Sequence, residues 1–128
     1  MKIPENLSYS TEHLWVQLTE DGSCLAGITD YAQDLLGDIV FVELPTIGAP
    51  LTAGVACGLV ESVKTGSDLH APLDGTVETV NSALENTPEL INDKPYETWI
   101  FRFRPSNAAD LKSLLSPVAY GELLGNTN

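Results

Sequence analysis

Hydrophobic and polar residues alternate along several short segments of this chain, which is the pattern of half-buried β-strands. Strands are predicted at 13–18, 24–28, 38–44, 55–63, 75–80 and 99–104. The segment 38–44 differs from the others because it is continuously apolar at its centre, which predicts a central strand covered on both faces. Many short strands at regular spacing predict a mainly β protein, built as an antiparallel β-sandwich or flattened barrel.

The helix-forming segments are few and short. Thr29 or Asp30 can cap a short helix near residues 29–36, and Gly37 suits the position just after its end. Beyond Pro105, leucines recur at helical spacing, which predicts two further helices. We therefore expect a β scaffold with one short helix in its first third and helices at its C-terminal end.

The segment from Leu59 to Val77 predicts a β-hairpin whose turn carries Lys64. Valines give the first arm its strand character, and polar and apolar residues alternate along the second arm until Pro72 interrupts it. Gly66 is the residue best suited to a positive φ in a three-residue loop, because it lacks the Cβ that excludes other residues from that region. Lys64 is therefore expected at or beside the apex of the hairpin.

Lys64 is also isolated from other cationic side chains. It is the only lysine or arginine between Lys2 and Lys94, and the carboxylates of Glu61 and Asp68 flank it. A surface lysine is usually no more than a solvated charge. A single amine at a hairpin tip is, however, also what a modifying enzyme requires if it must find and acylate one particular lysine.

The residues around Lys64 resemble the lipoylation site of the glycine cleavage system H protein. The local match comprises Glu61-Ser62-Val63-Lys64, Ser67-Asp68 and Ala71-Pro72-Leu73-Asp74-Gly75. Further matches in the same order are His13 with Trp15, 27–33, 36–45, 81–84, 88–92 and Pro95-Tyr96. The resemblance extends over about residues 7–124. It implies a single domain, 1–128, with the flattened β-barrel of lipoyl and biotinyl carriers, a barrel-sandwich hybrid.

This resemblance implies a carrier protein without catalytic activity of its own, with one lipoic acid per chain joined by an amide bond to Lys64. The lipoyl arm would accept the aminomethyl group of glycine from a PLP-dependent glycine decarboxylase, the P protein. It would then present that group to a tetrahydrofolate-dependent aminomethyltransferase, the T protein. Dihydrolipoamide dehydrogenase, the L protein, would reoxidise the arm. A lipoate ligase or octanoyltransferase would attach the cofactor, and the carrier is expected to be a monomer.

Three other residues are candidates for contact with the arm or with the modifying enzyme. Glu61 and Asp68 would guide that enzyme to the lysine, or serve as solubilising charges. His13 matches a family position that lines the groove where the loaded arm rests, and the alternative for this histidine is a structural hydrogen-bonding role. Leu14 stands where many relatives carry an acidic residue. Its presence predicts weaker polar anchoring of the loaded arm.

The charge balance limits the classes of partner that the protein can bind. Its 18 acidic and 6 basic residues give a formal net charge of −12. Such a surface repels phosphate groups and anionic lipids, so we expect no nucleic-acid or membrane partner, and basic docking faces on the partner enzymes. Cys24 and Cys57 are expected to be buried thiols in a reducing compartment. With no apolar or arginine-rich leader in the sequence, a bacterial cytoplasmic location is expected, or the mitochondrial matrix if a transit peptide has been removed.

Four alternatives remain open on the sequence alone. A lipoyl or octanoyl relay that donates to other lipoyl-dependent complexes would use the same lysine. A biotin carrier is less favoured, because biotin sites generally flank their lysine with methionine and here Val63 and Thr65 flank Lys64. A Schiff-base enzyme would need the pKa of the lysine lowered by burial or a nearby cation, and an exposed tip beside carboxylates offers the opposite. A structural interaction domain would leave Lys64 unmodified.

Overall fold

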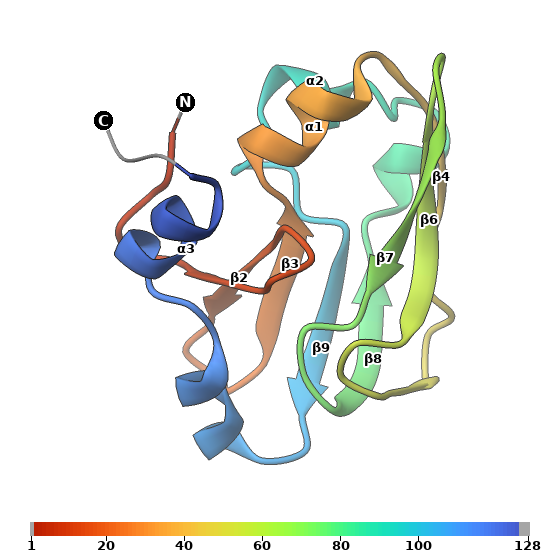
Figure 1. Cartoon of the computed structure of the whole chain (residues 1–128). Helices are drawn as coiled ribbons and strands as arrows, with labels where there is room; N and C mark the ends of the chain where they lie inside the picture. Colours follow the sequence, from red (N-terminus) through yellow and green to blue (C-terminus); the bar gives the residue numbers. More distant parts are fainter. Residues whose placement is uncertain (1, 126–128) are drawn as a thin grey trace.

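The computed structural model describes residues 2–125 and consists of two antiparallel sheets with short helices around them (Figure 1). The larger sheet has the order β1-β2-β3-β9-β8-β5, and the smaller has the order β4-β6-β7. The strands of the larger sheet are β1 Ser8–Tyr9, β2 Leu14–Leu18, β3 Cys24–Ile28, β9 Phe101–Pro105, β8 Gly75–Val80 and β5 Pro50–Leu51. Those of the smaller are β4 Ile39–Glu43, β6 Ala56–Ser62 and β7 Gly66–His70. This confirms the predicted antiparallel fold. Met1 and residues 126–128, which the expected single domain includes, lie outside the described residues.

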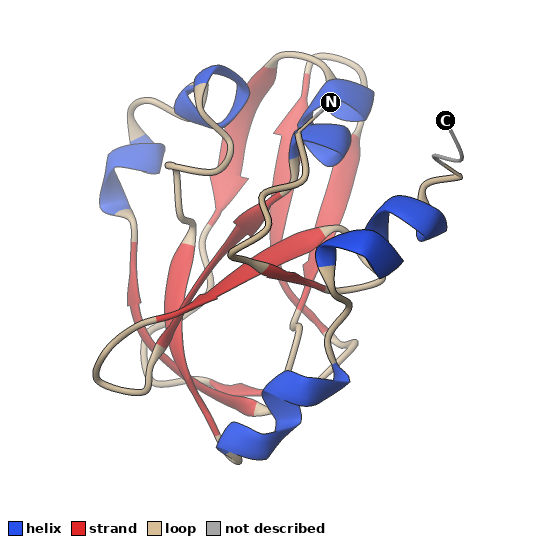
Figure 2. Ribbon diagram, turned by 90° about the vertical axis from the view of Figure 1, so that its left-hand side faces the viewer, coloured by secondary structure: helices blue, strands red, loops and turns tan. Residues whose placement is uncertain are grey.

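The helices lie around the edges of the strand layers (Figure 2). They are α1 Asp30–Leu36, α2 Leu90–Asp93 and α3 Pro117–Leu123, with two 3-10 helices, η1 Ser82–Glu85 and η2 Ala108–Ser113. The predicted helix near residues 29–36 is confirmed, because the Thr29 side chain caps α1 by accepting from the N–H of Ala32. Of the two expected C-terminal helices, the first is a 3-10 helix and the second is α-helical. Among residues 2–125, the helices are too short or too polar to cross a lipid bilayer.

The main hydrophobic core lies between the two sheets and contains buried residues from both of them. Strand β9 is internal to the larger sheet, where it pairs with β3 on one side and β8 on the other. Its Phe101 and Phe103 side chains are fully buried, with ring centroids 5.7 Å apart. A second cluster, formed by Leu7, Tyr9, Trp15 and Tyr120, packs α3 against β1 and β2.

The expectation that residues 38–44 form a central strand covered on both faces is wrong. Strand β4 is at the edge of the smaller sheet, and among the described strands it pairs only with β6. The register shifts between Ile39 and Phe41, so Val40 and Phe41 are both exposed, by 53% and 49%. Because a bulge inserts one extra residue, two consecutive side chains can share a face. The continuous apolar run therefore corresponds to a β-bulge in an edge strand, and not to a strand that is buried on both faces.

Candidate functional site

Strands β6 and β7 form the predicted hairpin, and Lys64 is exposed at the centre of its three-residue turn. The last bonded pair of the ladder is Glu61 with Gly66. Ser62 closes the turn, because its N–H donates to the carbonyl of Thr65 at 2.7 Å. The Ser62 Oγ accepts from the N–H groups of both Lys64 and Thr65, each at 3.1 Å. The Ser62 side chain therefore holds the backbone segment that carries Lys64.

Gly66 does not have the positive φ that the sequence suggests for it. The glycines with positive φ are Gly22, Gly37, Gly48, Gly54 and Gly125. Gly66 is instead the first residue of β7, and a Cβ built on it would meet the side chains of Leu59 and Glu61 at ordinary contact distances of 3.5 and 3.6 Å. The hydrogen bonds of Ser62, rather than a left-handed glycine, determine the shape of this turn.

A groove of about 120 Å³ lies between the hairpin, α1 and the segment that precedes β2. Its walls are mainly apolar, from Leu14, Ile28, Ala32, Leu35, Leu36, Val60 and Leu69. Its polar lining comes from Glu12, His13, Ser67 and Asp68. The structure thus brings two of the predicted site residues, His13 and Asp68, to one groove. Glu61 lies outside it on β6, and Glu12 is a lining residue that the sequence interpretation missed.

His13 has a structural role as well as a position at the groove. Its Nδ1 lies 2.9 Å from the hydroxyl of Tyr120, which is also 2.7 Å from Thr29 Oγ1. Its ring packs against that of Tyr31, with centroids 5.1 Å apart. Burial lowers the pKa of His13 by disfavouring the charged ring, and the nearby Glu12 carboxylate opposes this only partly. The uncharged ring is therefore the native form at neutral pH.

This gives a pH-dependent prediction for His13→Asn. Because the folded pKa of His13 lies below its unfolded value of about 6.5, its contribution is complete above that pH and is lost as the pH falls through the folded pKa. Asparagine tolerates the positive φ of 69° at this position. The free energy of unfolding is measured by urea titration at pH 7.5 and at pH 5.5. We expect its decrease between pH 7.5 and pH 5.5 to be smaller in the variant than in the wild type. Equal falls in both proteins would contradict the assignment.

Glu12 also connects the groove to the end of the hairpin. One of its carboxylate oxygens lies 3.7 Å from Nδ1 of His70, the last residue of β7. Both side chains are partly exposed, so the pair contributes little to stability. The Glu12 carboxylate therefore lies beside β7, at the rim of the groove.

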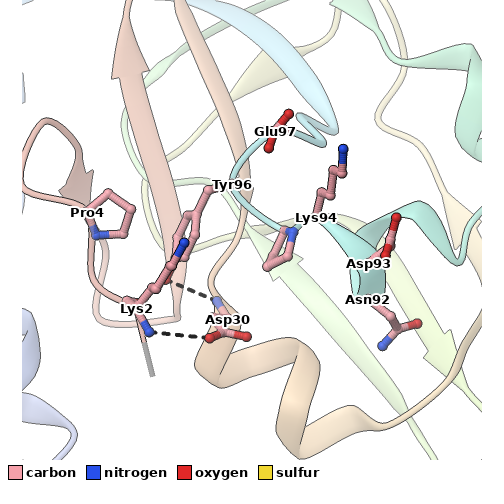
Figure 3. Close-up of a pocket in the computed structure, with 9 residues that line it drawn as sticks. Lys2, Pro4, Asp30, Asn92, Asp93, Lys94, Tyr96 and Glu97 are labelled. Carbon is pink, nitrogen blue, oxygen red and sulfur yellow. Dashed lines mark hydrogen bonds between the residues drawn. The ribbon is translucent and has the colours of Figure 1, made fainter.

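A second and larger cavity, of about 400 Å³, lies beside α2 and the N-terminal segment (Figure 3). The Tyr96 hydroxyl donates to the carbonyl of Lys2 at 2.6 Å and accepts from the N–H of Asp30 at 3.1 Å. The Lys2 N–H in turn donates to the Asp30 carboxylate at 3.4 Å. These bonds tie the N-terminal segment to α1. The residues that line the cavity come from outside β6 and β7, so it is separate from the hairpin tip.

An exposed amine at the tip of a tight hairpin, on a barrel-sandwich of antiparallel sheets, defines a carrier domain of the lipoyl and biotinyl type. A family model described as glycine cleavage H-protein matches residues 7–127. The chain belongs to the glycine cleavage H-protein family, the lipoyl carriers of the glycine cleavage system. This confirms the resemblance seen in the sequence.

Individual relatives agree over nearly the whole chain. A glycine cleavage system H protein of Methylobacillus flagellatus is 65% identical over 125 residues, which are 98% of this chain and 100% of that protein. One of Salmonella arizonae is 49% identical over 123 residues, with 95% of each chain covered. The crystal structure of a glycine cleavage system H protein from Mycobacterium marinum superposes with a TM-score of 0.86 at 38% identity, covering 95% of this chain and 98% of that one.

Proposed function

We propose that Lys64 carries lipoic acid, one per chain, in an amide bond to its Nζ. The observation that supports this most directly is the exposure of Lys64 at the centre of a turn whose backbone Ser62 holds. In the attachment step, Nζ attacks the carbonyl carbon of an activated acyl group from the modifying enzyme. The ammonium first loses one proton to give the attacking amine. The amide C–N bond then forms, the bond from that carbon to its leaving group breaks, and the nitrogen loses a second proton. The lysine changes from a cation to a neutral amide.

The groove fits a long, mainly apolar arm with a cationic end. When bound, the lipoyl group supplies a disulfide that accepts the aminomethyl group. The leucines of α1 and β7 that line the groove offer an apolar surface, and Glu12 and Asp68 place two carboxylates at its polar side. Leu14 is 1% exposed and forms part of the apolar wall. We propose that Glu12 and Asp68, with His13 beside them, provide the acidic contact for the arm that Leu14 cannot provide.

This role requires several partners and no chemistry from the carrier itself. We propose that the arm serves the glycine decarboxylase, the aminomethyltransferase and dihydrolipoamide dehydrogenase, after a lipoate ligase or octanoyltransferase has attached it. The formal charge of −12 supports docking on basic faces of these enzymes. In the described part of the chain, no three metal-binding side chains lie close enough to hold an ion. The carrier is proposed to act in the bacterial cytoplasm as a monomeric domain, so that the tip remains free to enter several active sites.

Mass spectrometry of the protein from its native host tests the attachment. We expect the intact mass to exceed that of the bare chain by one lipoyl group, and peptide mapping to place the increase on Lys64. The peptides that contain Lys94 and Lys112 serve as internal controls, because the proposal leaves both unmodified. A bare Lys64 in cells supplied with lipoate would contradict the proposal and favour a structural interaction domain.

The two groove carboxylates give a second prediction, for the double variant Glu12→Gln with Asp68→Asn. Without the carboxylates, the ammonium of the aminomethyl group loses its charge-assisted contacts, each of which contributes on the order of 1 kcal/mol. Because the two contacts together contribute about 2 kcal/mol, we expect the loaded arm to be hydrolysed roughly thirtyfold faster, measured by release of formaldehyde and ammonia from methylamine-loaded protein. Glu61→Gln is the matched control, because Glu61 is near the lysine but outside the groove. An unchanged rate in the double variant would exclude this contact.

A further inference from the structure

The Lys64 side chain does not extend straight into solvent but lies over the loop that follows α1. A Cβ built on Gly37 would be 3.1 Å from Lys64 Cε and 3.7 Å from its Nζ. The shorter of these distances is tighter than ordinary van der Waals contact. The end of the lysine side chain therefore passes directly over Gly37, in the space that a side chain at that position would enter.

The backbone at Gly37 is held by the end of α1. Gly37 has φ 82° and ψ −155°, a combination that is essentially restricted to glycine. Its N–H donates to the carbonyl of Gln33 at 3.0 Å, which ends the helix. Its carbonyl accepts from Nδ2 of Asn92 on α2 at 2.9 Å.

Asn92 braces this loop on both sides. Its Nδ2 also donates to Oε1 of Gln33 at 2.9 Å, and its Oδ1 accepts from the N–H of Ile39 at 2.8 Å. One amide side chain therefore binds the last turn of α1, the Gly37 carbonyl and the first residue of β4. This half-buried amide therefore adds three hydrogen bonds to the loop's own backbone bonds.

The hairpin tip is attached to the same loop. The N–H of Val63 donates to the carbonyl of Asp38 at 3.0 Å. Figure 1 shows the tip of the β6–β7 hairpin beside the connection from α1 to β4. Lys64 follows Val63 in the sequence, and Gly37 precedes Asp38. The bond between Val63 and Asp38 therefore keeps Lys64 opposite Gly37.

We propose that Gly37, braced by Asn92, is a seat for the Lys64 side chain, meaning a surface on which the side chain rests so that its amine is oriented for acylation. This inference rests on the proposed attachment of lipoic acid to Lys64. Because the partial negative charge at a helix C-terminus attracts a cation, the end of α1 favours the unmodified ammonium on the seat. Acylation removes that charge but leaves the contact of the methylene groups with Gly37. Gly37 and Asn92 act through Lys64, so both are positioning residues.

Two glycine variants, both at positions with a positive φ, distinguish loss of the seat from the backbone strain that any side chain causes at such a position. Gly37→Ala places a methyl group under Lys64, whereas Gly54→Ala adds one at a glycine with φ 83° that has nothing within 4 Å of the new Cβ. With purified lipoate ligase, lipoate and ATP, we expect Gly37→Ala to lower kcat for acylation by about fivefold with little change in KM, since a displaced amine reaches the reactive geometry less often. Gly54→Ala should stay within about twofold of the wild type. Equal kcat values for all three proteins, or equal losses in the two variants, would overturn the seat.

A measurement on the wild type keeps the proposal testable if Gly37→Ala folds poorly. In the unmodified protein, we expect nuclear Overhauser contacts between the Lys64 Hε protons and the Gly37 Hα protons, and we expect Asn92→Ala to weaken them. Their absence in the wild type would exclude the seat, even if mass spectrometry finds lipoic acid on Lys64. Conversely, contacts together with a bare Lys64 in the native host would refute the attachment and leave the side-chain arrangement in place.

Discussion

Replacing Lys64 with arginine should abolish lipoylation and all glycine cleavage that depends on this protein, with little change in stability. Arginine retains the positive charge, but its guanidinium stays protonated and cannot serve as the acylated amine. The side chain is exposed at the tip of a turn whose hydrogen bonds involve the backbone and Ser62, so the fold does not depend on it. The expected effect is complete because no neighbouring lysine or arginine exists between Lys2 and Lys94 to replace it.

The test compares Lys64→Arg with Lys112→Arg in cells whose own H protein has been deleted. Lys112 is on η2, far along the chain from the hairpin, and provides the same change of side chain without touching the proposed site. Cleavage of labelled glycine and the intact mass of the carrier are measured in both strains. Glycine cleavage at the wild-type rate in the Lys64→Arg strain would show that the acyl cofactor is attached elsewhere or is not required.

The largest loss of stability is expected for Phe103→Ala. Phe103 is fully buried on the internal strand β9, opposite Cys24 of β3 and Val77 of β8, and its removal leaves a cavity between the two sheets. Truncation of a buried phenylalanine typically costs about 3–5 kcal/mol. Since β9 connects both halves of the larger sheet, little relaxation is available to close the space.

Phe41→Ala is the matched control for this variant. The same atoms are removed, but Phe41 is on the edge strand β4 and 49% exposed, so we expect a loss below about 1 kcal/mol. Both free energies of unfolding are to be obtained from urea titrations of the unmodified proteins. Similar losses for the two variants would mean that the sheet positions assigned to β4 and β9 are incorrect.

Much of the local structure could be predicted because it depends on neighbouring residues. The bounds of β3 and β8 agree with the predicted strands at 24–28 and 75–80, and Thr29 caps α1 as expected. The last strand begins at Phe101 rather than at Trp99, and Ile100, on the face expected to be polar, is fully buried. Periodicity identifies a strand well, but it locates the ends less well, because hydrogen bonds to distant strands decide where the ladder stops.

The candidate site was predicted in part. Lys64 is recognisable from its isolation and from the hairpin pattern around it, both of which are local properties. The groove is not recognisable from local properties, because all of β2 through β6 lies between Glu12 and Asp68 in the sequence. The two residues come to one groove only when the hairpin packs near β2. A carboxylate immediately before His13 was the available signal for Glu12.

By itself, the amino-acid sequence determined the β class, the hairpin and the single amine at its tip, since side-chain period and turn chemistry act over a few residues. Only the tertiary structure decided that β4 is an edge strand, that the turn depends on Ser62 rather than Gly66, and that Gly37 lies under Lys64. Each of these results depends on which distant segments become neighbours. That choice follows from packing the two sheets over one core, and no local pattern records it.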